Sequence, residues 1–235
     1  MWTRRAVMIG AGLAAASCRP RQQAAAASAA PAAPPTGPGA PLALAARAQI
    51  GVTTHYDPAY RTLAYPGGDV PRSTGACTDV LIRAARDAYG ADLQRLVHED
   101  MAAHFAAYPH RWGLAAPNSN IDHRRVPNLE AWLARQGALV WKSGAAIWGT
   151  RFPGPFESGD ILTWRCALSN GPHVAIVAVG GTAAQTRIVE NKGGGVREAP
   201  LSVSFEDGAV AHFRWRPPIP APDRAWLERV GTGTA

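Results

Sequence analysis

The spacing of apolar residues changes once along this chain, and that change restricts the fold it can adopt. Before Trp141, apolar residues recur every three or four positions, which predicts helices over residues 42–50, 80–89, 92–108 and 129–136. After Trp141 they alternate or form short runs, which predicts strands over residues 159–164, 173–179, 187–190 and 209–215. Helices followed by an antiparallel sheet around one core indicate an α+β fold.

Glycine, proline and asparagine mark the ends of the predicted helices. Gly90 closes the helix over residues 80–89, Pro109 stops the next helix, and Asn128 caps the last one. Residues 53–71 are rich in Tyr, Pro and Gly, so we expect loops or short strands there.

The first residues have the pattern of an export signal. Arg4 and Arg5 precede a short apolar run over residues 6–16, and the adjacent arginines resemble a twin-arginine signal. Small residues before Cys18 resemble a lipoprotein cleavage site, at which Cys18 would carry the lipid; cleavage among residues 24–30 is the alternative. We therefore expect export to the periplasm, with membrane contact only through this signal or a lipid anchor.

Composition divides the rest of the chain. Residues 1–18 form the predicted signal, and residues 19–41 form an Ala- and Pro-rich linker that cannot bury enough apolar surface to fold. Residues 42–226 form the predicted domain, which we expect to be a monomer, and residues 227–235 form a flexible tail.

The chain is basic, with a net charge of +7, to which Arg4, Arg5, Arg19 and Arg21 outside the predicted domain contribute. The remaining excess suits an anionic surface or a substrate with carboxylates. Nucleic acid is not an expected partner, because no Lys/Arg cluster is interleaved with aromatic residues and no binding motif is present.

Cys77 lies where the helix over residues 80–89 should begin. A thiol on the first turn of a helix meets unpaired backbone N–H groups and the positive end of the helix dipole, and both favour the thiolate. With a histidine nearby, such a thiolate is the nucleophile of a cysteine hydrolase. This chemistry requires no cofactor.

His173 is the best candidate for that histidine, because it begins a predicted strand and therefore lies at the end of the sheet. The next strand can run antiparallel and place Glu190 or Asn191 level with His173. Either a carboxylate or an amide would fix the tautomer of the imidazole, so both residues remain candidates for the third catalytic position.

Cys77 could instead form a disulfide with Cys166, because two cysteines in an oxidising compartment can be oxidised to a disulfide. Cys166 lies in a strand-like run, however, where a cysteine usually packs as a small hydrophobic residue. We therefore expect Cys77 to be reduced.

A polar cluster precedes the last predicted helix, formed by Asp122, His123, Arg124 and Arg125. Its arginines could bind substrate carboxylates in a cleft, or the cluster could be a set of ion pairs that holds the loop on the domain. Asp79 is a further candidate to line the site, with helix capping as the alternative explanation.

The remaining histidines predict no metal site. His98 and His104 lie six residues apart on one predicted helix, which places them on different faces, unlike the i, i+4 pair of a zinc protease. His55, His110 and His212 are isolated, so each is expected on the surface or hydrogen-bonded within the core.

The order of these features resembles the NlpC-type cell-wall peptidases, which have a papain-like fold. The resemblance consists of a cysteine at a helix start, a Gly-Asp strand, a His-Val-x-Ile-Val strand and a polar residue on the following strand, over about residues 53–214. It implies catalytic roles for Cys77, His173 and either Glu190 or Asn191.

A longer match is to an uncharacterised family of exported bacterial proteins, a domain of unknown function. Four segments carry it: YPGGDVP from Tyr65, CTDV from Cys77, LVHEDM from Leu96 and NIDHRRVPN from Asn120. Members of the family that this chain resembles usually have His-Asn at the two positions where this chain has Glu190-Asn191. This difference leaves the third catalytic position open between Glu190 and Asn191.

Together these features favour an exported thiol hydrolase that cleaves amide bonds in cell-wall peptides. Cys77 would attack the carbonyl carbon, His173 would transfer the proton, and the N–H of Cys77 would help to stabilise the oxyanion. Two alternatives stay open: a non-catalytic binding module for wall peptides or a partner protein, and a thiol acyltransferase acting on lipid.

Overall fold

The computed structural model describes residues 33–144, 148–167, 171–204 and 207–217. The predicted export signal, Cys18, most of the predicted linker and the predicted tail lie outside these residues. No helix within the described residues is long and apolar enough to span a bilayer.

The described residues form an α+β fold, as predicted. The helices are α1 (Ala40–Arg47), α2 (Cys77–Tyr89), α3 (Leu93–Ala103) and α4 (Val126–Arg135), with short 3₁₀ turns η1 (Phe105–Ala107), η2 (Asp122–Arg124) and η3 (Leu201–Ser204). The strands are β1 (His55–Tyr56), β2 (Thr74–Gly75), β3 (Leu139–Lys142), β4 (Ile161–Arg165), β5 (Pro172–Val179), β6 (Arg187–Glu190), β7 (Arg197–Pro200) and β8 (Gly208–Phe213).

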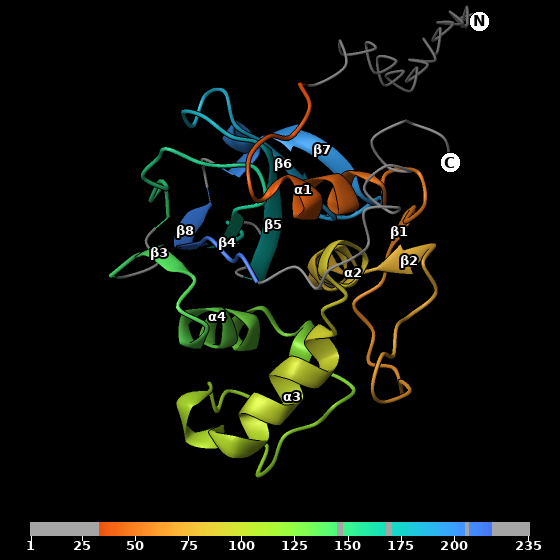
Figure 1. The fold of residues 1–235 in the computed structure, drawn as a ribbon. Helices are drawn as coiled ribbons and strands as arrows, with labels where there is room; N and C mark the ends of the chain where they lie inside the picture. Colours follow the sequence, from red (N-terminus) through yellow and green to blue (C-terminus); the bar gives the residue numbers. More distant parts are fainter. Residues whose placement is uncertain (1–32, 145–147, 168–170, 205–206, 218–235) are drawn as a thin grey trace, which may run out of the picture. The chain divides into compact units, whose positions relative to one another are not determined.

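Six strands form one antiparallel sheet in the order β3-β8-β4-β5-β6-β7. The two short strands β1 and β2 pair separately and in parallel. Helices α1 and α2 pack against each other and against β5, and α4 contacts β5 and β8 (Figure 1). The first turn of α2 therefore lies beside the sheet that contains the predicted histidine.

Strand alternation gives the sheet two buried faces. Ile161, Val174 and Ile176 belong to the core that includes the helices, whereas Leu162 and Ala175 belong to a second apolar cluster. The second cluster is covered by aromatic residues of the segment before β4 and by Leu201 of η3. Burial on both faces explains why β4 and β5 are continuous apolar runs.

Several predicted boundaries are wrong. The helix expected to reach Tyr108 ends at Ala103, because the chain then tightens into the 3₁₀ turn η1 before Pro109. Asn128 does not cap α4: the helix begins at Val126, and the buried amide of Asn128 donates a hydrogen bond to the carbonyl of Asp122.

The start of the domain and four strands also differ from the predictions. α1 begins at Ala40, and Ala33 of the predicted linker accepts a hydrogen bond from Arg47. Strands β1, β2, β3 and β7 are two to four residues long, and most of their residues are exposed. Such short strands carry too few residues for an alternating pattern.

Candidate active site

Cys77 is the first residue of α2, and local interactions determine that position. Ala76 has an extended backbone, and its N–H donates to the Asp79 carboxylate at 2.6 Å, which caps the helix from within its first turn. Gly90 ends the helix with a left-handed backbone, φ 63°. The Cys77 N–H lies in the first turn, where helix geometry provides no intrahelical acceptor.

His173 and Glu190 meet because of the β5–β6 register. Ile176 pairs with Val189, which puts Glu190 opposite Ala175, two residues from His173 on the same face of the sheet. The His173 Nε2 atom lies 3.0 Å from Glu190 Oε2, and both side chains are buried. The other carboxylate oxygen accepts hydrogen bonds from Arg197 at 2.8 and 3.2 Å.

The His173 side chain is also hydrogen-bonded to Cys77. Burial lowers the pKa of His173, but the hydrogen bonds and negative charges of Cys77 and then Glu190 outweigh it and raise the pKa to about 9. Burial raises the pKa of Glu190, and its hydrogen bond to His173 reverses that effect and lowers it below the usual range. The arrangement favours a protonated His173 beside an ionised Glu190.

Asn191 does not contact His173. Its side-chain amide donates to the carbonyl of Gly75 at 2.9 Å and accepts a hydrogen bond from the Gly193 N–H at 3.3 Å. Alternation explains the difference, since consecutive residues of a strand face opposite ways. Asn191 therefore holds the backbone two residues before Cys77, and Glu190 is the residue that contacts His173.

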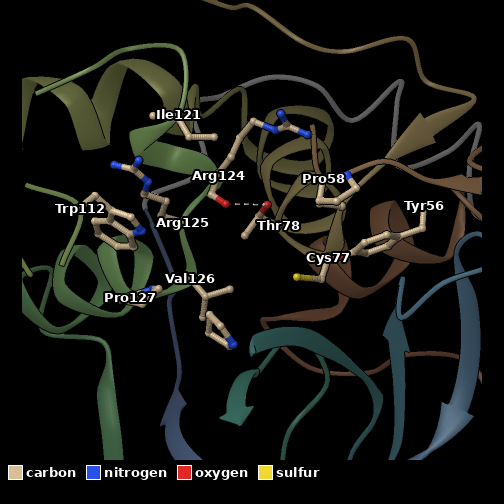
Figure 2. A pocket seen from close by; sticks show the side chains of 12 residues that line it. Tyr56, Pro58, Cys77, Thr78, Trp112, Ile121, Arg124, Arg125, Val126 and Pro127 are labelled. Atoms are coloured by element: carbon tan, nitrogen blue, oxygen red, sulfur yellow. Dashed lines mark hydrogen bonds between the residues drawn. The ribbon is translucent and has the colours of Figure 1, made fainter. Parts of the chain in front are cut away.

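A cleft of about 200 Å³ opens beside Cys77 (Figure 2). In Figure 2 the sulfur of Cys77 points into this cleft, and the ring of Tyr56 is directed toward Cys77. The lining residues are mostly apolar or neutral: Tyr56, Pro58, Ala76, Cys77, Thr78, Trp112, Ile121, Arg124, Arg125, Val126, Pro127 and Pro172.

Asp79 and Arg124 form a buried ion pair. Both nitrogens Nε and Nη2 of Arg124 lie 2.9 Å from the Asp79 carboxylate. Arg124 also donates to the carbonyls of Ala59 at 2.8 Å and Asp57 at 3.2 Å. Of the two readings of the polar cluster, ion pairing that holds a loop describes Arg124, and helix capping describes Asp79.

Asp122 and His123 are not among the residues that line the cleft. Both are buried; burial raises the pKa of Asp122, and burial together with Arg124 lowers the pKa of His123 to about 4. Arg125 differs: it lines the cleft, and its guanidinium lies 4.1 Å above the ring of Trp112. The predicted substrate cluster thus contributes two arginines to the cleft, of which Arg124 is already bound.

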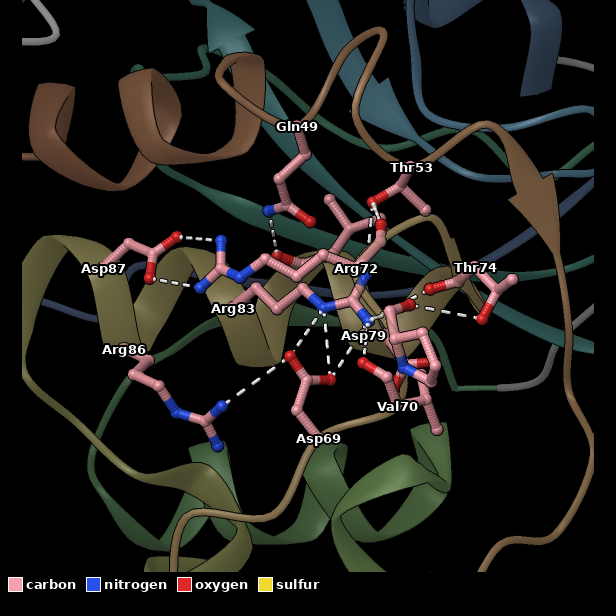
Figure 3. Close-up of polar contacts among 12 residues, drawn as sticks. Gln49, Thr53, Asp69, Val70, Arg72, Thr74, Asp79, Arg83, Arg86 and Asp87 are labelled. Atoms are coloured by element: carbon pink, nitrogen blue, oxygen red, sulfur yellow. Dashed lines mark hydrogen bonds and ion pairs between the residues drawn. The ribbon is translucent and has the colours of Figure 1, made fainter. Parts of the chain in front are cut away.

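Arg83 is a buried residue that sequence reasoning missed (Figure 3). Its guanidinium donates to Asp69 at 2.9 Å, to Thr53 at 3.1 Å and to the carbonyls of Val70 and Thr74, each at 3.0 Å. This network holds residues 53–75 against the helix that begins with Cys77.

The second cysteine and the isolated His212 both lie in the core. No disulfide joins Cys77 and Cys166, the two buried cysteines in the described part of the chain. His212 is hydrogen-bonded within the core, with Nε2 2.7 Å from Asp160. Among the described residues, no group of three or more His, Cys, Asp or Glu side chains could hold a metal ion.

Comparison with known proteins gives the family. The DUF1287 family, a domain of unknown function, matches residues 43–215. The chain belongs to the DUF1287 family. The chain is also 48% identical over 172 residues to the uncharacterised protein YijF of Escherichia coli K12, a match that covers 72% of this chain and 78% of YijF. No solved structure matches.

The prediction of an uncharacterised family is thus confirmed, and the DUF1287 match includes Cys77, His173 and Glu190. Tyr56 is a cleft residue within the match that the sequence did not single out. Burial and then the charge of Cys77 raise the pKa of Tyr56 to about 12, so its hydroxyl keeps its proton at neutral pH. Its place in a Tyr-, Pro- and Gly-rich loop, two residues before Pro58, was a sequence signal too general to use.

Proposed function

We propose that this DUF1287 protein is a thiol hydrolase of papain-like, NlpC-type architecture that cleaves amide bonds in cell-wall peptides. The observation that carries the proposal is the buried Cys77–His173–Glu190 arrangement, whose cysteine lines a cleft. A cysteine on a helix start, a histidine in hydrogen-bond contact with it and a carboxylate on that histidine are the parts of a nucleophilic triad.

The chemistry proceeds through a thioester. The Cys77 thiolate attacks the amide carbon, and the His173 imidazolium donates its proton to the departing amine nitrogen. The neutral His173 then takes a proton from water, which attacks the thioester and releases a carboxylic acid and the Cys77 sulfur. Glu190 accepts a hydrogen bond from His173 throughout and favours its protonated form.

The negative oxygen of the tetrahedral intermediate needs hydrogen-bond donors. The Cys77 N–H is one donor, because the first turn leaves it without an intrahelical acceptor. We assign the Tyr56 hydroxyl as the second donor, since Tyr56 lines the cleft beside Cys77 and stays protonated.

Purified peptidoglycan incubated with the protein, with Cys77→Ala and with Cys166→Ala tests the proposal. Mass analysis of the released fragments should show new amine and carboxyl ends for wild type and Cys166→Ala, and none for Cys77→Ala. Identical products from wild type and Cys77→Ala end the hydrolase proposal and leave the binding module or the acyltransferase.

The site of action follows from the same proposal. A wall-degrading enzyme must leave the cytoplasm, and the arginine pair and apolar run over residues 4–16 supply an export signal. Fractionation of cells expressing the full chain should place it in the periplasm, and a Cys18→Ala change should release it from membranes if Cys18 carries a lipid.

A further inference from the structure

Arg125 stands out among the residues of the cleft because its guanidinium has no hydrogen-bond acceptor in the described part of the chain. Its closest approach to a carboxylate is 3.7 Å, from Nη1 to Asp122, and Nη1 is buried without a hydrogen-bond partner among the described residues. Arg124, the preceding residue, has two carboxylate oxygens and two carbonyls as acceptors. Of these two adjacent arginines, Arg124 has hydrogen-bond acceptors for its guanidinium and Arg125 has none among the described residues.

Asp122 is a weak counter-ion for Arg125. Burial raises the pKa of Asp122, and one of its oxygens is already hydrogen-bonded to the Asn118 N–H. Arg124 and Arg125 are the only charged side chains among the described residues that line the cleft, and Asp79 neutralises Arg124. Arg125 is therefore the one arginine of the cleft whose ion pair, with Asp122 at 3.7 Å, includes no hydrogen bond.

Trp112 holds that charge in a fixed orientation. The guanidinium of Arg125 stacks on the indole ring, and in Figure 2 both lie on the wall of the cleft across from Cys77. A stacked, planar guanidinium presents its N–H groups along one edge, which suits two parallel hydrogen bonds to a carboxylate. A lysine could not reproduce this geometry.

We propose that Arg125, stacked on Trp112, is the specificity-determining residue of the cleft and binds a free carboxylate of the substrate. The substrate class is acidic peptides, in which a carboxylate lies at a fixed distance from the amide that Cys77 attacks. This inference rests on the proposed function for its reaction, although carboxylate binding itself requires no turnover.

The test uses binding, so that it is independent of catalysis. Soluble muropeptides from muramidase-digested peptidoglycan, and the same muropeptides with carboxylates converted to carboxamides, are titrated calorimetrically into full-length Cys77→Ala protein. Loss of a charge-assisted hydrogen-bonded pair should weaken binding of the amidated muropeptides roughly tenfold or more. Adding Arg125→Gln should weaken binding of the native muropeptides by the same factor and leave the amidated ones unchanged.

Two further variants separate a specific subsite from general charge. Arg95→Gln removes the same charge from an exposed pair on α3 and should leave both affinities unchanged. Arg125→Lys keeps the charge without the planar edge and should give an intermediate preference, with circular dichroism confirming the fold. Equal losses for Arg125→Gln and Arg95→Gln, equal binding of the two muropeptide sets, or no binding at millimolar concentration would overturn the subsite.

The outcomes also separate the two proposals. If Cys77 cleaves native and amidated muropeptides equally, the hydrolase stands and the carboxylate subsite fails. If no peptidoglycan product depends on Cys77 but the Arg125 preference holds, the subsite stands and the hydrolase fails.

Discussion

Replacing Glu190 with glutamine tests the partner of His173 directly. Glutamine has nearly the same shape, so its amide oxygen can still accept the hydrogen bond that Glu190 accepts at 3.0 Å. The negative charge is lost, and Arg197, half of whose side chain is exposed, can turn to solvent. The change therefore isolates the charge of Glu190 from its geometry.

The expected magnitude follows from that loss. A hydrogen bond to a charged group contributes about 1–1.5 kcal/mol more than a neutral one, and about 1.4 kcal/mol corresponds to one pKa unit or a tenfold change in rate. We expect the pKa of His173 to fall from about 9 by roughly one unit in Glu190→Gln. Alkylation of Cys77 by iodoacetamide at neutral pH should slow up to about tenfold, because the imidazolium that accompanies the thiolate is less stable.

The assay is a pH titration of the His173 ring signals by NMR, with alkylation followed by intact-protein mass. Asn191→Ala is the matched control, since Asn191 contacts backbone carbonyls and not His173. It should leave the pKa of His173 unchanged. An unchanged pKa in Glu190→Gln, or an equal shift in Asn191→Ala, would refute the assignment.

Three further changes test the site. Cys77→Ala should lower the pKa of His173 by more than Glu190→Gln does, because Cys77 makes the largest contributions that raise this pKa and burial then dominates. The same NMR titration measures the pKa, and a smaller shift than in Glu190→Gln would contradict this expectation. Arg124→Met leaves the buried Asp79 carboxylate unpaired and should lower the free energy of unfolding by about 3–5 kcal/mol in urea titrations, whereas Arg95→Met should have no measurable effect. Gly75→Ala would bring a Cβ atom to 3.0 Å from the Asp79 Cβ and should lower the free energy of unfolding by about 1–3 kcal/mol in the same urea titrations. An unchanged urea midpoint would show that the loop can move to accommodate the methyl group.

The sequence predicted the parts of the site that depend on periodicity. Gly90 and the apolar spacing place Cys77 at a helix start, and the strand pattern places His173 at a strand start, as the structure has them. Glu190 and Asn191 remained alternatives because the choice depends on register, which a sequence shows only when both strands are known. Once Ile176 is paired with Val189, alternation selects Glu190.

The sequence could not predict contacts made by irregular segments. Arg124 and Arg125 are neighbours with the same side chain, but the 3₁₀ turn η2 ends between them. Arg124 pairs with Asp79, and Arg125 stacks on Trp112. Residues 53–75 have no periodicity that would bring Tyr56 to Cys77. Those placements depend on tertiary hydrogen bonds, above all on those made by Arg83.

The Arg83 network has a consequence for how this protein can vary. Three of the acceptors of Arg83 are backbone carbonyls, those of Val70, Pro71 and Thr74. A carbonyl is present whatever side chain its residue carries, so these three hydrogen bonds require a particular path of the chain and no particular side chain. Arg83 itself has no such freedom, because no other side chain offers five donors in one plane. We expect laboratory substitutions at the half-buried Thr74 side chain to keep these hydrogen bonds, and substitutions of Arg83 to lose them.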